Sequence, residues 1–308
     1  MRTAARPKSL NTRKLGPIYS LGKVEVSRLL QWGRRELRDL GEEEARASAE
    51  RLLEEILQIN RSAVYLDLAK EVTQDQAKEF SRLVILRKER MPLAYLVKRA
   101  YFRDEVVEVG PGCLIPRPET ELLIENFLKE DQDVLTRDFE FLDLGTGSGA
   151  LGISLLRVLP RARGTLSDIS PEALEYAESN LKRYKLEERS RIILSDLFEC
   201  FKRQKAVPKW DAIFCNAPYL SAKDLREAQP EICFEPRVAL DGGEDGLDFY
   251  RRLFRECANF LKCHGALILE IGSTQRERLT LMIRELNLFS SVHSYQDLAG
   301  LDRVIIAR

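Results

Sequence analysis

Hydrophobic positions recur every three to four residues between residues 24 and 91, which is the spacing of a buried helix face. Thr73 followed by Gln76 has the form of a capping box and predicts the start of a third helix. We therefore expect residues 24–91 to form a small helical domain with solvated, charged outer faces. The apolar positions of the three stripes are Val26, Leu29, Leu30 and Leu37; Ala45, Ala49, Leu52, Leu53, Ile56 and Leu57; and Phe80, Leu83, Val84 and Leu86.

Two short β-prone runs, residues 94–96 and 106–109, flank a charged turn and predict a β-hairpin connector over residues 92–116. The segment 115–121 then predicts a helix start, because Pro118 suits a first turn in which no backbone N–H partner is needed. Its acidic residues suit the positive end of the helix dipole. A second, larger domain is expected over residues 117–308.

After residue 133, short apolar runs alternate with amphipathic segments. This alternation predicts an α/β fold with a doubly wound, Rossmann-like sheet of seven mostly parallel strands. The last two strands are joined without a helix, so we expect them to form an antiparallel hairpin at one edge. Predicted strands occupy residues 139–144, 164–168, 191–194, 211–215, 266–270, 291–295 and 303–307, and predicted helices lie near residues 150–159, 171–185, 247–261 and 275–286.

Composition narrows the possible function. The 308 residues are 44% hydrophobic, which is enough for two modest cores. The 49 basic and 49 acidic residues balance, so binding to extended nucleic acid is disfavoured. No apolar run approaches the roughly 18 residues of a membrane span. The six cysteines form no CxxC pair and the chain has two histidines, so we expect reduced thiols, a cytoplasmic location and no metal site.

Residues 1–23 are basic and contain no acidic residue. We interpret them as a disordered basic tail. An organelle transit peptide is the alternative, because such peptides are also basic and poor in acidic residues. The segment has few serines and no clear amphipathic stripe, which favours the tail.

A glycine loop follows the first predicted strand of the sheet and enters a helix. Its residues are Gly145, Thr146, Gly147, Ser148 and Gly149. The pattern is G-x-G-x-G and differs from the G-x-G-x-x-G that holds a dinucleotide pyrophosphate. Its glycines permit positive φ angles and a close approach of the backbone to a ligand.

The ends of the next two predicted strands carry acidic residues. Asp168 lies 19 residues after Gly149, where a carboxylate can accept both hydroxyls of a ribose. Asp196 and Leu197 follow the third strand, where an adenine edge would lie. All these strand ends are expected at one crevice, and S-adenosylmethionine fits this crevice better than NAD does.

The fourth predicted strand ends in the turn Asn216, Ala217, Pro218 and Tyr219. An amide nitrogen is a poor nucleophile because its lone pair is delocalised. The Asn216 side-chain oxygen and the Ala217 carbonyl could accept its two N–H groups and aim the nitrogen at a methyl group. Tyr219 could stack on the planar group. The turn therefore indicates methyl transfer to an amide or an aromatic amine.

Together these motifs resemble the protein-(glutamine-N5) methyltransferase family, PrmC/HemK, which methylates the glutamine of the Gly-Gly-Gln loop in class I peptide-chain release factors. The resemblance covers nearly the whole chain after the basic tail, and the string Ile-Pro-Arg-Pro-Glu-Thr-Glu is more specific than the glycine loop. The matching segments are residues 92–95, 114–121, 145–149, 234–237, 239–247, 270–272 and 297–300.

The resemblance implies an enzyme that tunes translation termination, and we expect this enzyme to be cytoplasmic and monomeric. It implies that residues 145–149, Asp168, Asp196, Leu197 and Asn216 contact S-adenosylmethionine. It further implies that residues 216–219 hold the glutamine, with Asn216, Pro218 and Tyr219 in the catalytic role. The helical domain would help to dock the release factor.

Two positions depart from the family's pattern. Ala217 stands where the family usually has the first proline of Asn-Pro-Pro-Tyr. The carbonyl is retained, but the backbone is freer, at an entropic cost of about 0.4–1 kcal/mol. Leu197 stands where relatives often have a tryptophan near adenine, so we expect weaker cofactor binding.

Two other functions remain open from the sequence. One is an N6-adenine methyltransferase on DNA or RNA, because Asn-Pro-Pro-Tyr turns also serve adenine amines; the neutral charge argues against it. The other is a methyltransferase fold that binds a partner without turnover, which only Ala217 suggests.

Overall fold

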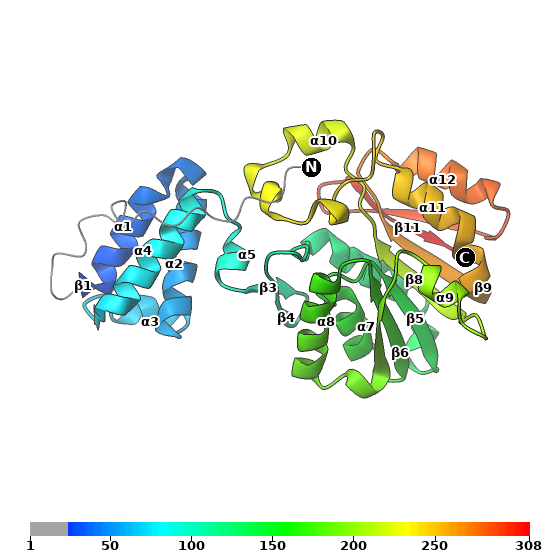
Figure 1. Cartoon of the computed structure of the whole chain (residues 1–308), viewed down its shortest axis with the longest axis horizontal. Coiled ribbons are helices and arrows are strands. Elements are labelled where there is room, and N and C mark those ends of the chain that lie inside the picture. Colours follow the sequence, from blue (N-terminus) through cyan, green and yellow to red (C-terminus); the bar gives the residue numbers. More distant parts are fainter. Residues whose placement is uncertain (1–23) are drawn as a thin grey trace. The chain divides into compact units, whose positions relative to one another are not determined.

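The computed structural model describes residues 24–308, and the chain divides into two compact units between Val97 and Lys98 (Figure 1). The predicted basic tail, residues 1–23, lies outside the described residues. The segment 92–116, treated above as one connector, is shared between the two units. No helix in the described part of the chain is long and apolar enough to cross a membrane.

The first unit is helical, as the sequence predicts. Helices α1, α2 and α4 pack against one another through the predicted stripes, and the capping box of Thr73 and Gln76 is formed at the start of α4. Gly33 of α1 allows close packing, because a Cβ there would lie 2.8 Å from Phe80. The elements are β1 (Val24–Glu25), α1 (Val26–Glu36), η3 (Arg38–Leu40), α2 (Glu42–Leu57), α3 (Arg61–Leu66), β2 (Glu71–Val72), α4 (Gln74–Lys88) and α5 (Leu93–Leu96).

The hairpin is displaced from its predicted position. Residues 94–96, expected as a strand, form the helical turn α5, and the hairpin instead joins β3 (Arg99–Phe102) to β4 (Glu105–Glu108). The turn begins after Pro92, whose carbonyl accepts the backbone N–H of Tyr95 at 3.1 Å. Leu96 then packs into the helical core. Burial of this side chain outweighs the β propensity of a run too short to show a period.

The second unit contains the predicted seven-stranded sheet, in the order β10-β11-β9-β8-β5-β6-β7. Strands β5 to β9 run parallel to one another, and β11 pairs antiparallel with both β9 and β10, which confirms the predicted edge hairpin. The strands are β5 (Phe139–Leu144), β6 (Ala162–Asp168), β7 (Ser190–Leu194), β8 (Trp210–Asn216), β9 (Leu261–Glu270), β10 (Val292–Gln296) and β11 (Asp302–Ala307).

Helices cover both faces of this sheet. Helices α7 and α8 lie on one side of the strands, and α11 and α12 lie on the other (Figure 1). The helices are α6 (Glu121–Glu130), α7 (Ala150–Val158), α8 (Pro171–Tyr184), α9 (Glu199–Lys202), α10 (Ala222–Glu227), α11 (Asp248–Glu256) and α12 (Arg276–Glu285), with short 3-10 turns η4 (Pro118–Thr120), η5 (Gln132–Leu135), η6 (Glu187–Arg189), η7 (Pro230–Phe234), η8 (Arg237–Ala239) and η9 (Cys257–Phe260).

One predicted boundary between a helix and a strand is wrong. The helix expected to reach residue 261 ends at Glu256, and β9 begins at Leu261, before the predicted start at residue 266. The exposed Cys263 and His264 interrupt the apolar pattern of this strand, so its first half does not look buried in the sequence.

Side chains of α8 hold the hairpin, and the buried one among them is Asn180. Asn180 of α8 accepts the backbone N–H of Glu108 at 2.7 Å and donates to the carbonyls of Glu108 and Ser148, at 3.0 and 2.9 Å. Because Ser148 belongs to the glycine loop, Asn180 ties that loop to the hairpin. Both the oxygen and the nitrogen of the buried Asn180 side chain therefore have hydrogen-bond partners.

Phe80 is a central side chain in the core of the helical unit, and its removal tests how much that core contributes to stability. It is fully buried and meets Trp32 edge-on at 6.2 Å between ring centroids. We expect Phe80→Ala to lower the free energy of unfolding of this unit by about 3–5 kcal/mol, because it removes a large buried side chain and leaves a cavity. Urea denaturation followed by circular dichroism measures the loss. The exposed Lys78→Ala on the same helix is the control and should change stability by less than about 0.5 kcal/mol.

Candidate active site

A pocket lies at the carboxyl ends of the parallel strands, beside the point where the chain order reverses. The chain runs from β5 to β6 and β7 on one side, and returns to β8 on the other side of β5. Crevices at such reversals are the usual ligand sites of open α/β sheets. Nine of the predicted site residues line this pocket: Gly145, Thr146, Gly147, Ser148, Asp168, Asp196, Leu197, Asn216 and Pro218.

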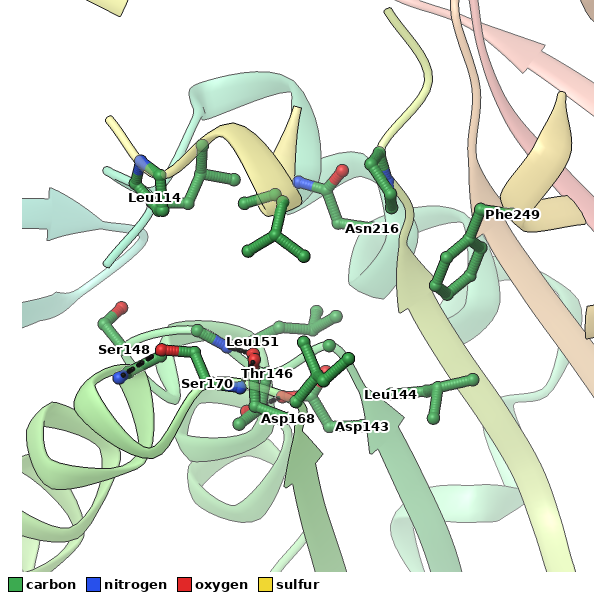
Figure 2. A pocket seen from close by; sticks show the side chains of 18 of the residues that line it. Leu114, Asp143, Leu144, Thr146, Ser148, Leu151, Asp168, Ser170, Asn216 and Phe249 are labelled. Atoms are coloured by element: carbon green, nitrogen blue, oxygen red, sulfur yellow. Dashed lines mark hydrogen bonds between the residues drawn. The ribbon is translucent and has the colours of Figure 1, made fainter. Parts of the chain in front are cut away.

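The pocket has two facing walls. Figure 2 shows Leu114 and Asn216 across the open space from Thr146, Ser148 and Asp168, with Phe249 on the Asn216 side. The first wall carries the end of β8, and the second carries the glycine loop and the end of β6. A ligand between them would therefore contact both groups of predicted residues.

Three predicted site residues do not line the pocket. Gly149 starts α7 and packs against Ala177, where an added Cβ would lie 3.3 Å from that residue. Ala217 is buried in the core on the α11 side of the sheet. The Tyr219 ring packs on the same core, and its hydroxyl donates to Glu270 at 3.2 Å.

The glycine loop has the conformation that its sequence permits. Gly145, Gly147 and Gly149 have φ angles of 77°, 56° and 82°, and residues with a Cβ rarely have such positive φ angles. The backbone N–H groups of Gly145 and Thr146 both donate to the carbonyl of Ser167 on β6, at 2.8 and 2.9 Å. These bonds hold the loop against the end of the neighbouring strand.

Asp168 is prepared as an acceptor by the backbone. One carboxylate oxygen accepts the N–H of Gly147 at 2.8 Å, and the other accepts the N–H of Ser170 at 2.9 Å. Burial raises the pKa of Asp168, and the backbone hydrogen bonds oppose that rise. Each oxygen keeps capacity for one more donor, so the carboxylate can accept two neighbouring hydroxyls from a ligand.

A second carboxyl group, that of Asp143, forms hydrogen bonds with the glycine loop and with α7. Asp143, at the end of β5, is buried and accepts the hydroxyl of Thr146 and the backbone N–H of Gly152. Burial raises its pKa to about 7. Asp143 therefore holds the start of the loop to the start of α7, and its side chain also borders the pocket.

The end of β7 carries a strained residue. Leu197 has a φ of 48° although its side chain is branched and buried, a conformation that costs about 1–2 kcal/mol. Its neighbour Asp196 accepts a hydrogen bond from Arg252 of α11 at 2.7 Å. Arg252 and Phe249 line the pocket, but nothing in their sequence surroundings had marked them. Their position depends on how α11 packs on the sheet.

Asn216 is held by a short chain of polar groups that the sequence had not indicated. Its side-chain nitrogen donates to the Thr120 hydroxyl at 2.9 Å, and that hydroxyl donates to a carboxylate oxygen of Glu270 at 2.5 Å. Glu270 ends β9 directly beside Asn216 in the strand register. A glutamate that ends an apolar strand next to the Asn-x-Pro-Tyr strand is the signal that could have revealed it.

Two further side chains shape the pocket wall. Glu235 is buried and accepts the backbone N–H of Ile115 at 3.0 Å and the Arg117 guanidinium, which joins residues 114–117 to the segment around Pro236. Gln275 donates to the carbonyls of Tyr219 and Gly246, both at 3.0 Å. Gln275 thus ties the turn after β8 to the loop before α11.

Comparisons with known proteins support this picture. Residues 28–97 match the family described as PrmC N-terminal domain, and residues 118–243 match the family described as methyltransferase small domain. The 16S rRNA methyltransferase of T. thermophilus, solved with AdoMet and guanosine, has a TM-score of 0.50 at 19% identity. That alignment covers 68% of this chain and 49% of the solved chain, and it shows the shared fold.

Two relatives align along most of their length. The release factor glutamine methyltransferase of Geobacter sulfurreducens is 34% identical over 284 residues, which are 92% of this chain and 96% of that protein. The release factor glutamine methyltransferase of Chlamydia trachomatis serovar D is 38% identical over 260 residues, which are 83% of this chain and 84% of that protein. With this identity and coverage, the chain belongs to the family of release factor glutamine methyltransferases.

Proposed function

We propose that this protein transfers a methyl group from S-adenosylmethionine to the side-chain amide nitrogen of the glutamine in the Gly-Gly-Gln motif of class I release factors, leaving S-adenosylhomocysteine. The observation that carries the proposal is the position of Asn216, which faces the glycine loop and Asp168 across one pocket. Membership of the family supports the choice of substrate.

The residues of the second wall suit S-adenosylmethionine, which supplies an electrophilic methyl group when bound. Asp168, with its two backbone donors in place, would accept the ribose hydroxyls. The positive φ angles at Gly145 and Gly147 leave room for the backbone to approach the ligand. Leu197 and Ile169 add apolar surface at the same end of the pocket, where an adenine ring would lie.

Asn216 would hold the substrate. Its side-chain oxygen and the carbonyl of Ala217 would accept the two N–H groups of the glutamine amide, so that the nitrogen lone pair points toward the methyl group. Such orientation can supply several kcal/mol of the rate acceleration. No strong base is required before attack, because the nitrogen loses its proton readily once it carries the new methyl group. Stacking of Tyr219 on the amide stays a prediction from the sequence; in the structure its ring packs on the core and is outside the pocket lining.

We also propose a cellular location, a docking unit for the release factor and an oligomeric state. We place it in the cytosol, which agrees with six cysteines that are all thiols. We assign docking of the release factor to the helical unit, which is supported by the match of residues 28–97 to the family's N-terminal domain. We expect the working enzyme to be a monomer.

Methylation of a release factor tests the proposal directly. The purified protein is incubated with methyl-labelled S-adenosylmethionine and an unmethylated class I release factor, in parallel with a release factor whose Gly-Gly-Gln glutamine is alanine. Mass spectrometry should find one methyl group on the Gly-Gly-Gln peptide of the first substrate alone. Methyl transfer to an oligonucleotide adenine, or none to any substrate despite cofactor binding, would contradict the proposed function.

Substitutions in the two walls should change different quantities, kcat for one wall and the cofactor Kd for the other. Asn216→Ala should lower kcat by about a hundredfold or more and leave the cofactor Kd within a few fold, because the glutamine loses its orientation. Asp168→Ala should chiefly raise the cofactor Kd. Titration calorimetry with S-adenosylhomocysteine and single-turnover rates measure both. Asp138→Ala, an exposed aspartate just before β5, is the control. A large loss of cofactor affinity in Asn216→Ala with its rate retained would contradict these roles.

Ala217→Pro restores the family's usual sequence. We expect it to keep or raise kcat, by less than about tenfold, because proline restricts Asn216 and retains the carbonyl at position 217. Steady-state methylation of the release factor measures the effect, with thermal unfolding as a check that the buried position accepts the ring. A variant that folds normally but has no turnover would show that the backbone at residue 217 does not act as we propose.

A further inference from the structure

An asparagine side chain has two ends of nearly equal shape and opposite hydrogen-bonding character. Its oxygen accepts and its NH2 group donates. In the proposed function the substrate amide brings two donors, so only the oxygen of Asn216 can receive it. Rotation of the side-chain amide by half a turn would set donor against donor and disfavour binding. The orientation of this amide therefore needs a partner that distinguishes its two ends.

Thr120 can make that distinction. Its hydroxyl has a single proton, which it donates to Glu270, so toward Asn216 it can act only as an acceptor. The structure accordingly has the Asn216 nitrogen at 2.9 Å from the Thr120 oxygen. Thr120 is 5% exposed and borders the pocket beside Asn216.

Glu270 in turn decides the direction of the Thr120 hydroxyl. An ionised carboxylate only accepts, and the two Glu270 oxygens receive the hydroxyls of Thr120 and Tyr219. The side chain is 1% exposed, and it does not line the pocket. Every hydrogen bond in the chain from Asn216 through Thr120 therefore runs toward Glu270.

We propose that Glu270 is a positioning residue: through Thr120 it holds the Asn216 amide with its oxygen available to the substrate. This inference rests on the proposed function of Asn216 as the acceptor for the glutamine amide. It deepens that function by adding two residues outside the Asn-x-Pro-Tyr turn. Glu270 acts by directing hydrogen bonds and does not touch the substrate.

The control depends on the charge of Glu270. A protonated carboxyl group can donate to Thr120, which frees the threonine proton for the Asn216 oxygen and removes the fixed direction. Burial raises the pKa of Glu270 to about 7, and the two hydroxyl donors oppose the rise. Around this carboxyl group, the titratable or charged side chains from every packed element are Glu119 of η4, Cys215 of β8, Tyr219, Tyr250 of α11 and Arg303 of β11.

The activity should increase with pH around the pKa of Glu270. The ionised form of Glu270 is the one that fixes Asn216, and it is formed as pH rises through the raised pKa. Of its charged neighbours, Glu119 pushes the pKa up and Arg303 pulls it down. The neighbouring Cys215, Tyr219 and Tyr250 all have pKa values raised by burial, so they stay neutral over this range. We expect kcat, measured at saturating cofactor so that effects of Asp143 on cofactor binding do not contribute, to rise with the ionisation of Glu270 near pH 7.

Glu270→Gln tests the inference because glutamine has the same shape but one donor end. It can accept from only one of the two hydroxyls, so the direction of the Thr120 proton is no longer imposed. We expect kcat to fall about tenfold at pH 8 and the titration near pH 7 to disappear, with the cofactor Kd unchanged. Glu105→Gln is the matched control: Glu105 is also a buried carboxylate with a raised pKa, but it lies on β4 and outside the pocket lining. It should retain the wild-type pH profile.

Substitutions at Thr120 test the same inference independently of Glu270. Thr120→Val removes the hydroxyl and should reproduce the loss in kcat, whereas Thr120→Ser should restore most of the rate because it retains the hydroxyl. Thermal unfolding and cofactor binding show whether each variant is folded. A Glu270→Gln or Thr120→Val protein that is folded and keeps the wild-type kcat and pH profile overturns the inference.

A measurement without turnover separates this inference from the proposed function. In the free protein, the side-chain NH2 resonances of Asn216, identified by their absence in Asn216→Ala, should shift with pH near 7 and lose that shift in Glu270→Gln. If the release factor is not methylated but this shift is present, the proposed function fails while the control by Glu270 stands. If the resonances do not respond to pH, or respond equally in Glu270→Gln, the inference is wrong.

Discussion

The parallel pairing of β5 with β8 is the constraint on which the rest of the site depends. Phe141, Leu142 and Asp143 of β5 lie in register with residues 212–214 of β8. These strands are far apart in the sequence, because the chain first completes β6 and β7 on the other side of β5. Their pairing brings the glycine loop after Leu144 to the same edge as Asn216. Cofactor chemistry and substrate chemistry meet there because two segments more than 60 residues apart end together.

Both walls of the pocket use the same physical device, a buried carboxyl group that accepts a threonine hydroxyl. Asp143 holds Thr146 beneath the glycine loop, and Glu270 holds Thr120 behind Asn216. Burial raises the pKa of each acid to about 7, so the ionised form of each carboxylate, which dominates above that pH, costs stability. That cost is understandable where a direction of hydrogen bonding must be specified, because an apolar side chain cannot orient a hydroxyl or an amide.

The sequence predicted what depends on local patterns. The seven strands, the antiparallel edge and the capping box at Thr73 follow from short-range periods and end signals, and the structure has them. Residues 94–96 were misassigned because burial of Leu96 in the helical core outweighed a three-residue propensity. Thr120 and Glu270 could not be paired in advance, since their contact joins residues 150 positions apart. Contacts such as Asp196 with Arg252 also arise only from how helices settle on the sheet.

The most direct test of the account is a crystal structure of the protein with S-adenosylhomocysteine and a Gly-Gly-Gln peptide from a release factor. The account predicts the glutamine amide nitrogen at about 3 Å from both the Asn216 side-chain oxygen and the Ala217 carbonyl oxygen. Thr120 should still lie between Asn216 and Glu270, and the ribose hydroxyls should lie on Asp168. A glutamine amide bound away from residues 216 and 217, or an Asn216 side chain turned from Thr120 toward another partner, would contradict it.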